Sequence, residues 1–457
     1  MKFKIQLVTE DPSTNLKSTK TLTCIEKNSC NLEEIGLSLK EAKNTLEALQ
    51  THLISGQIEK YLEEWDQCNC CGKSRRKKGH HKIVFRTLFG NNAINSPRYY
   101  HCKCEKSQAK TFSPLCKVFS ELVSPERGYL ETKWASKVSF QQAADLMNDI
   151  LPLDNKVNAS SIRNHLVKTG RRMQDDLKEE KHFYQKELNQ SEETYQRFSV
   201  GIDGGYVRNW DSKKKHFEVI AGKSIPSQGK DRFFGFVDTL PDSKSKRNLF
   251  ETLTSQGLNK ISAIDFFSDG AENLRAIQYN ISPESAHYLD WFHITMKITV
   301  LNQYVKGIKK IGEKIGNELE RDLTKIKWYL WHGNLYQATS LLENFSETAE
   351  EVTSDYDHHK NFKKLTAEFE TYINRNSRFI TNYGERYRNK EMISTSFVES
   401  TVNVLVAKRF SKKQQMQWTK EGAHLMLQTR AKTLNNSLQD EFKKWYPKIE
   451  LEYSKAA

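Results

Sequence analysis

The chain has 457 residues, of which 37% are hydrophobic and 11% are aromatic. That length allows about three domains of roughly 150 residues, with enough apolar side chains for their cores. The 71 basic residues outnumber the 57 acidic ones, and the formal net charge of +14 suggests an anionic partner such as nucleic acid. No run approaches the roughly 18 apolar residues of a membrane span, so we expect no membrane partner.

The start of the chain and its cysteines indicate a reducing compartment. Residues 1–11 contain no long apolar stretch typical of a signal peptide, which predicts a cytoplasmic protein. Five of the eight cysteines fall between positions 68 and 104. Disulfide frameworks in secreted domains are usually spread more widely, so this clustering favours metal ligation.

The N-terminal segment 1–65 starts like a strand and continues with a helical pattern. Apolar residues recur at three- and four-residue spacing between Leu39 and Leu53, which predicts an amphipathic helix that ends near Gly56. The next segment, 66–117, is rich in cysteine and basic residues. Alternation from Phe85 to Phe89, a turn signal at 90–92 and a second extended run predict a small β-hairpin.

Two cysteine pairs flank the predicted hairpin: Cys68 and Cys71 before it, and Cys102 and Cys104 after it. The two-residue gap of the first pair lets two thiolates converge on one ion, and Gly72 permits the tight turn. The four cysteines predict a tetrahedral zinc ribbon. The second pair is spaced more tightly than usual, and Cys70 and His101 are spare ligands. Ordinary reduced cysteines are the alternative.

Residues 118–195 are expected to be helical and to bind DNA. An apolar series from Trp134 to Ile150 ends at Pro152, and polar residues at 158–160 can cap a second helix. The second helix carries basic residues that a helix-turn-helix domain would place in the major groove: Arg163, His165, Lys168, Arg171 and Arg172. A small helical bundle with an exposed basic face is the alternative. A third, charged helix is expected over 175–192.

Residues 196–295 change to a β-type pattern. Three apolar runs, a helical stretch, a fourth run, a second helix and a fifth run predict an α/β domain. Segments 296–390 and 391–440 have helical spacing throughout, and 441–457 form a tail. The chain is therefore expected to be a multidomain α+β protein.

Three acidic residues occupy positions suited to catalysis. Asp203 and Asp269 each end an apolar run and precede glycine, and Glu399 lies in an apolar helical stretch. Carboxylates at the ends of neighbouring strands converge, and with a third from a helix they could hold two divalent ions about 4 Å apart. Hard oxygen ligands suit Mg²⁺ or Mn²⁺. A turn or cap role is the alternative for each acid.

Further polar residues follow the last predicted strand and Glu399. Asp290 and His293 lie three positions apart, so His293 could contact a scissile phosphate or orient a carboxylate. Trp291 could stack on an unpaired base, with a core position as the alternative. Basic residues after Glu399 are expected to contact the DNA backbone or to form a solvated helix face: Lys408, Arg409, Lys412 and Lys413.

Together these motifs resemble a bacterial insertion-sequence transposase with a DDE core, of the Kra-type family within the Mutator-like superfamily. The resemblance covers residues from about 65 to 436. It rests on CNCCG at 68–72, SPRYYHCKC at 96–104, YLETKWA at 129–135, GIDGGYV at 201–207, SDGAE at 268–272, LDWFH at 289–293, FVESTVN at 397–403 and QMQWT at 415–419.

The resemblance implies an RNase H-like fold in which Asp203, Asp269 and Glu399 bind the catalytic metals, aided by Asp290 and His293. The helical block 296–390 would then be an insertion in this core. The implied protein is associated with a bacterial nucleoid, binds terminal inverted repeats as a homo-oligomer, hydrolyses the phosphodiester bond at the element end and joins the 3′-hydroxyl to target DNA. Alternatives are a domesticated, catalytically silent DNA-binding protein and an RNase H-type nuclease without strand transfer.

Overall fold

The computed structural model describes residues 1–10, 17–105, 109–154, 156–180, 184, 187–188, 195–212, 215–353, 355–394, 396–411 and 416–451, without the side chains of Ser396 and Glu399. The chain divides into two compact units. One comprises residues 1–169 with 437–457, and the other comprises residues 170–436. Helix α5 (Ala159–Asp176) crosses the boundary between them.

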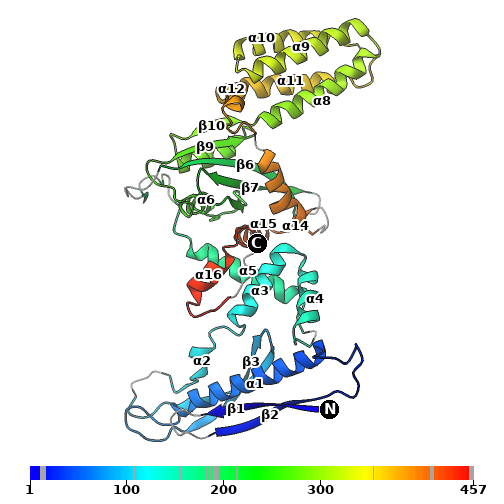
Figure 1. Cartoon of the computed structure of the whole chain (residues 1–457). Helices are drawn as coiled ribbons and strands as arrows, with labels where there is room; N and C mark the ends of the chain where they lie inside the picture. Colours follow the sequence, from blue (N-terminus) through cyan, green and yellow to red (C-terminus); the bar gives the residue numbers. More distant parts are fainter. Residues whose placement is uncertain are drawn as a thin grey trace. The chain divides into compact units, whose positions relative to one another are not determined.

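The first unit combines two small antiparallel sheets with helices (Figure 1). Its strands are β1 (Lys2–Glu10), β2 (Lys17–Glu26), β3 (Lys77–Thr87), β4 (Gly90–Tyr100) and β5 (Thr111–Phe112). Its other helices are α1 (Leu39–Glu63), α2 (Leu115–Val118), α3 (Pro125–Lys137), α4 (Phe140–Ile150) and α16 (Leu438–Trp445). β1 pairs with β2, and β4 pairs with both β3 and β5. The predicted hairpin and helix are confirmed. The helix was expected to end near Gly56 but α1 continues to Glu63, and β2 was not expected.

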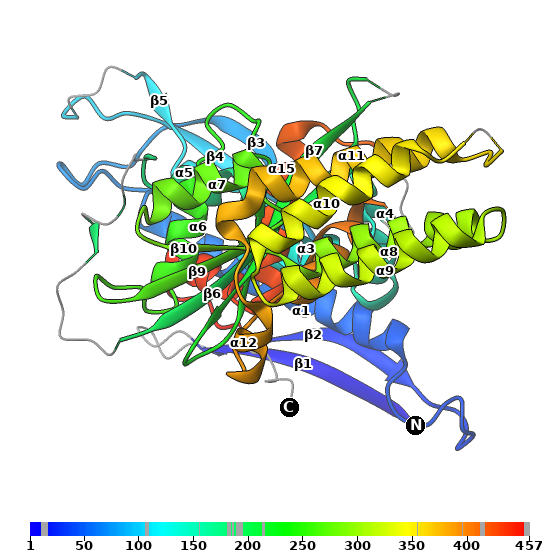
Figure 2. The same ribbon diagram turned by 90° about the horizontal axis from the view of Figure 1, so that it is seen from above.

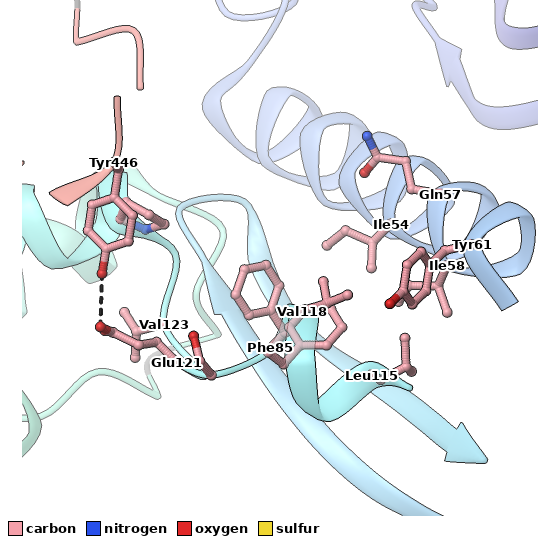
Figure 3. Close-up of a pocket in the computed structure, with 13 residues that line it drawn as sticks. Ile54, Gln57, Ile58, Tyr61, Phe85, Leu115, Val118, Glu121, Val123 and Tyr446 are labelled. Carbon is pink, nitrogen blue, oxygen red and sulfur yellow. Dashed lines mark hydrogen bonds between the residues drawn. The ribbon is translucent and has the colours of Figure 1, made fainter. Parts of the chain in front are cut away.

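A small apolar core holds the hairpin against α1. Ile54 on α1, Ile94 on β4 and Leu115 on α2 are buried together. Beside them lies a cavity of about 550 Å³, whose walls come from α1, β3 and the residues around α2 (Figure 3). The Tyr446 hydroxyl donates a hydrogen bond to Glu121 at 2.9 Å next to this cavity. The hairpin therefore rests on a core of its own.

Serine side chains cap the amino ends of α3 and α4, two of the helices predicted for this region. Ser124 accepts a hydrogen bond from Arg127 N at the start of α3, and Ser139 forms a capping box with Gln142 at the start of α4. The charged helix expected over 175–192 is wrong at its start, because α5 ends at Asp176 and residues 177–180 are not helical. Residues 178–180 are charged and exposed, so this stretch has no apolar side chain to bury as a helix. Residues 181–183, 185–186 and 189–194 lie outside the described part.

The second unit contains a five-stranded sheet with the order β10-β9-β6-β7-β8. Its elements are β6 (Arg197–Arg208), β7 (His216–Pro226), β8 (Arg232–Phe236), α6 (Ser245–Thr254), β9 (Ala263–Ser268), α7 (Glu272–Ile281) and β10 (Ala286–Leu289). β6, β7 and β8 are antiparallel, and β9 and β10 run parallel to β6. The predicted succession of strands and helices in 196–295 is confirmed.

Helices cover both faces of this sheet (Figure 1). On one face, α6 and α7 share a buried core with β6, β7 and β9, including Phe198, Phe266 and Leu249. The other face contacts a helical run formed by α13 (Ser396–Val402), the π-helical turn η3 (Asn403–Ala407) and α14 (Lys408–Phe410), together with α15 (Lys420–Leu434). Segments 196–295 and 396–434 therefore build one folded core.

The segment between them is helical, as predicted. It contains α8 (Trp291–Lys309), α9 (Glu313–Trp331), α10 (Leu335–Glu350), α11 (His359–Asn376), the short turn η2 (Ser377–Phe379) and α12 (Tyr383–Arg388). Helices α8 to α11 pack side by side around one apolar core, which begins at Leu289 on β10 (Figure 2). In the part of the chain that the structure describes, no helix combines the length and apolar character needed to cross a bilayer.

Candidate active site and metal centre

The register of the parallel strands brings three acidic residues into one row. Extending the observed pairing of β6 and β9 by two residues sets Asp203 opposite Asp269. Extending the pairing of β9 and β10 by one residue sets Asp269 opposite Asp290. Neighbouring strands lie about 4.8 Å apart. The three carboxylates therefore stand at one level, just past the carboxyl ends of β9 and β10 and within β6. The expectation that Asp203 ends its strand is wrong, because β7 continues to pair with β6 as far as Arg208.

Backbone N–H groups and neighbouring charges act on the carboxylates of this row. The backbone N–H of Gly204 donates to Asp203 at 2.8 Å, and that of Ala271 donates to Asp269 at 3.0 Å. Burial raises the pKa of Asp203, and the charges of Asp269 and Asp290 raise it further. This repulsion favours binding of cations among the acids.

His293 is held in this row by Asp290. Asp290 is fully buried and accepts both the backbone N–H of Phe292 at 2.9 Å and Nδ1 of His293 at 2.7 Å. Burial lowers the pKa of His293, but the hydrogen bond to Asp290 and the charges of Asp290 and Asp203 outweigh it, so the pKa stands above 6.5. Asp290 therefore fixes the ring and favours its protonated form.

Helix α13, which carries Glu399, packs on the face of β6 that carries Asp203. A Cβ atom on Gly201 would lie 2.0 Å from Val398 Cγ2, and Gly201 shares this face with Asp203 because side chains alternate along a strand. The absence of a side chain at Gly201 thus permits the close approach of α13. The Glu399 side chain itself lies outside the described residues, so its orientation stays a prediction.

A fourth carboxylate, Glu218 on β7, lies close enough to the acidic row to feel the charges of Asp269 and Asp203, and it was not predicted from sequence. Its Oε2 accepts a hydrogen bond from Asn273 Nδ2 at 3.1 Å. A Cβ on Gly204 would lie 2.6 Å from Glu218 Oε1, so Gly204 leaves room for this side chain. Burial and then the charge of Asp269 raise the pKa of Glu218. The only local signal is an acid between Phe217 and Val219 in an otherwise apolar strand.

The helical block also supplies groups to this region. A Cβ on Gly270, whose φ is +90°, would lie 2.3 Å from Asn376 Oδ1 on α11. Burial, followed by the charges of Asp269 and Asp290, raises the pKa of Tyr372 on the same helix. Lys297 Nζ, one turn beyond His293, lies 4.7 Å from the centre of the Tyr372 ring. These helices therefore line one side of the acidic row.

The donor chemistry of the row suits divalent cations. Asp203, Asp269 and Glu218 offer hard carboxylate oxygens in a half-buried setting that favours neutralisation by a cation. Within the described side chains, which exclude that of Glu399, no set of three carboxylates or imidazoles has all its ligand atoms within 4.8 Å of one another. The expected Mg²⁺ or Mn²⁺ site therefore remains a prediction.

The four cysteines predicted to bind zinc do come together. The sulfur atoms of Cys68, Cys71, Cys102 and Cys104 all lie within 4.8 Å of one another. Sγ of Cys68 is 3.4 Å from that of Cys104, and Sγ of Cys71 is 3.4 Å from that of Cys102. Tetrahedral zinc with bonds near 2.3 Å requires sulfurs about 3.8 Å apart. This cluster could therefore bind a metal such as zinc. Cys70 lies outside the cluster.

A second layer of polar groups supports this metal centre. Two oxygens of Glu105 accept hydrogen bonds from Arg75 at 2.7 and 2.8 Å, and one also accepts the backbone N–H of Cys102 at 2.9 Å. Nδ1 of His101, which was a spare ligand in the sequence prediction, lies 3.1 Å from Oε2 of Glu105. Backbone N–H groups of Cys70 and Cys71 lower the pKa of Cys68, which favours the thiolate that a metal requires.

The basic residues predicted to read DNA on α5 have mixed surroundings. Arg163 is exposed, as the prediction requires. Lys168 forms an ion pair with Glu121 at 2.9 Å, and Arg171 forms one with Glu421 at 2.8 Å. Arg172 is half-buried. Exposed ion pairs contribute little stability, so Lys168 and Arg171 can exchange a carboxylate for a phosphate at small cost.

The remaining predicted DNA contacts divide into exposed and buried residues. Lys408 is exposed, whereas Arg409 is fully buried and lies 5.1 Å from the Trp418 ring centre. The expected backbone contact of Arg409 is therefore wrong, because its guanidinium group packs inside the unit. Trp291 is half-buried between Trp331 and Tyr383, at ring distances of 5.0 and 4.8 Å. Lys412 and Lys413 lie outside the described residues.

Comparison with known proteins found no family model and no curated protein sequence that matches the chain.

Proposed function

We propose that this protein is a DDE transposase of the Kra-type family, which binds the ends of a mobile element, cleaves them and joins them to target DNA. The observation that carries the proposal is the row of Asp203, Asp269 and Asp290 at one level of three adjacent strands. Helix α13, with Glu399, packs on the face of β6 that carries Asp203. This arrangement suits phosphoryl transfer, in which positioning and charge stabilisation carry most of the catalysis.

The sheet supports the RNase H-like part of the proposal. Three antiparallel strands are followed by two parallel strands, each preceded by a helix, and the parallel strands join the sheet beside the first strand. The catalytic core is then split in sequence, and the helical block 291–388 is an insertion between β10 and α13. The close contact between Gly270 and Asn376 gives this insertion a direct influence on the loop of Asp269.

Each residue of the site has a distinct part in this mechanism. Asp203, Asp269 and Glu399 would hold Mg²⁺ or Mn²⁺, which would supply activation of the attacking water or 3′-hydroxyl and stabilisation of the leaving oxygen. Asp290 orients His293, whose protonated ring contacts the scissile phosphate. Lys297 provides a second cation on the same side of α8.

The first unit serves DNA recognition in this proposal. The four-cysteine cluster binds structural zinc and fixes the ends of the β3–β4 hairpin, while exposed residues such as Lys82 and Arg98 face outward for phosphates. Arg163 and Lys168 on α5 approach the terminal inverted repeats. A homo-oligomer would hold two element ends together in the bacterial nucleoid.

Cleavage and strand transfer on a labelled element end in Mg²⁺ test the proposal. Asp269→Asn should abolish both reactions while leaving binding of the element end unchanged, because it removes a metal ligand and no DNA contact. Asp231→Asn is the matched control, since Asp231 pairs with Lys223 at the other edge of the sheet and should keep full activity. Full activity of Asp269→Asn would refute the assignment of the site.

The same assay decides between the proposal and its main alternative. A wild-type protein that binds element ends but never cleaves them in Mg²⁺ or Mn²⁺ would be a catalytically silent DNA-binding protein. A protein that cleaves but does not join ends to target DNA would be an RNase H-type nuclease.

A further inference from the structure

The β6–β7 hairpin projects past the acidic row. β9 ends at Ser268, which the observed register sets level with Ile202 on β6. β6 continues for six residues beyond that level, to Arg208, with β7 as its antiparallel partner throughout. At about 3.3 Å per residue the projection is roughly 20 Å long. Because side chains alternate along a strand, Tyr206 and Arg208 lie on the face of β6 opposite the one that carries Asp203, beyond the level of the acids.

One face of the projecting hairpin carries exposed aromatic and basic side chains. Tyr206 and Arg208 are exposed, while Gly205 and Val207 between and before them are buried against the opposite face. Trp210, two residues beyond the end of β6, is also exposed. Tyr206 and Trp210 expose 69% and 61% of their surface. β6 and the two residues that follow it therefore present an aromatic–cation–aromatic series.

The neighbouring charges determine whether a DNA base or a phosphate can bind beside each of these side chains. Tyr206 lies directly across the ladder from Glu218, a carboxylate that repels a phosphate but not an uncharged base. Arg208 lies opposite His216, and Lys215 is exposed next to it, so cations outnumber Asp211 at this tip. DNA bases thus fit over the rings of Tyr206 and Trp210, and the phosphate backbone of the DNA fits along Arg208.

We propose that Tyr206, Arg208 and Trp210 form a stacking surface for unpaired DNA bases on the β6–β7 hairpin. This surface starts roughly 10 Å beyond Asp203 along β6. The inference rests on the proposed function, because it assigns the bound bases to an element end opened by the transposase. Stacking of a base on an aromatic ring tolerates any sequence. The surface therefore captures bases that unpair when an element end is opened, and leaves sequence recognition to other parts of the chain.

Binding of a short oligothymidylate in EDTA, followed by tryptophan fluorescence, tests this surface without metal or cleavage. Tyr206→Ala and Trp210→Ala should each weaken binding roughly tenfold, and Trp210→Ala should remove most of the fluorescence quenching. Tyr206→Phe and Trp210→Phe keep the rings and should bind almost as wild type. Arg208→Met should lower the salt dependence by roughly 0.7 in the log–log slope.

Matched controls lie on the helical block. Trp328 and Tyr336 are 62% and 79% exposed, and their alanine variants should leave binding and quenching unchanged. Unchanged affinity of the Tyr206→Ala, Trp210→Ala double variant, in protein with wild-type circular dichroism, would overturn the inference. So would equal quenching by a duplex of the same length, because paired bases cannot stack on the rings.

The two proposals can fail separately. If the wild type never cleaves DNA but the double variant still loses oligothymidylate binding, the transposase proposal fails and the stacking surface stands. If cleavage proceeds in Mg²⁺ and the double variant binds and cleaves as wild type, the stacking surface fails alone.

Discussion

Val398 on α13 lies directly over Gly201 on β6, at a distance that leaves no room for a side chain on the strand. A Cβ there would stand 2.0 Å from Val398 Cγ2 and 2.7 Å from Phe397 Cζ. Val398 is fully buried and β-branched, so it cannot rotate away. Because Gly201 has no Cβ atom, α13, which carries Glu399, can lie this close to β6, which carries Asp203.

Gly201→Ala should displace α13 and disturb the site. We expect a loss of about 1–3 kcal/mol in the free energy of unfolding, as is typical of overpacking, together with a larger loss of Mg²⁺-dependent cleavage. Urea denaturation and cleavage assays measure the two effects. Gly205→Ala is the control, because its Cβ would lie 3.4 Å from its nearest neighbours, Val219 and Val406. Equal behaviour of both variants would contradict the explanation.

Cys71→Ser and Cys70→Ser should differ in metal content. Cys71 belongs to the cluster of four sulfurs, whereas its exposed neighbour Cys70 does not. We expect about one zinc ion per chain in the wild type and in Cys70→Ser, and little zinc in Cys71→Ser, since three thiolates hold the ion poorly. Mass spectrometry of the metal content measures this difference. Loss of zinc from Cys70→Ser alone would reverse the ligand assignment.

Glu218→Gln should change the response to metal more than the binding of DNA. The substitution keeps an oxygen for Asn273 but removes a negative charge near Asp269. We expect the Mg²⁺ concentration for half-maximal cleavage to rise roughly tenfold. Binding of element ends in EDTA should not change. Glu284→Gln is the control, because Glu284 is exposed before the amino end of β10. An unaltered Mg²⁺ response would show that Glu218 acts only in packing.

His424 should make the second unit less stable as the pH falls. Its Nδ1 accepts the backbone N–H of Val237 at 3.1 Å, and burial lowers its pKa to about 4. In the unfolded chain the ring takes up a proton near pH 6.5. The stability that the neutral ring contributes is therefore present above pH 6.5 and is lost progressively as the pH falls to about 4.

Urea denaturation at pH 7 and pH 5 measures this contribution. His424→Gln should lower stability at both pH values but reduce the difference between them by about 2 kcal/mol. Part of the difference should remain, since burial also lowers the pKa of His287 to about 4. His216→Gln, at an exposed position on β7, should leave the difference unchanged. An unchanged difference in His424→Gln would exclude a role for its ionisation.

Local sequence patterns were sufficient to predict some parts of the structure. Asp269 follows a short apolar run and precedes glycine, a local signal for the end of a buried strand, and β9 does end at Ser268. The same signal is wrong at Asp203, because β6 continues to Arg208. The cysteine pairs flank a hairpin whose turn is also local, so their convergence follows from chain geometry. Strand order and register depend on pairing between distant segments, which a single sequence does not encode in any one window.

Other features could not be predicted because they depend on distant contacts. Glu218 and Tyr372 approach the acidic row from β7 and α11, far from the other acids in sequence. Arg409 lies in a basic run that is typical of an exposed helix, yet it packs against Trp418. β2 has mostly exposed side chains and no apolar face, so hydrophobic periodicity gives no sign of it.

Because β6 is synthesised before α13, Val398 can pack on Gly201 only late in the synthesis of the chain. During synthesis, β6 leaves the ribosome first, then β9, β10 and the whole helical block, and α13 emerges only afterwards. Until then, Gly201 lacks its cover and the face of β6 carrying Asp203 remains open. Under the proposed function, a nascent chain that ends within the helical block would lack Glu399 and would be unable to cut DNA.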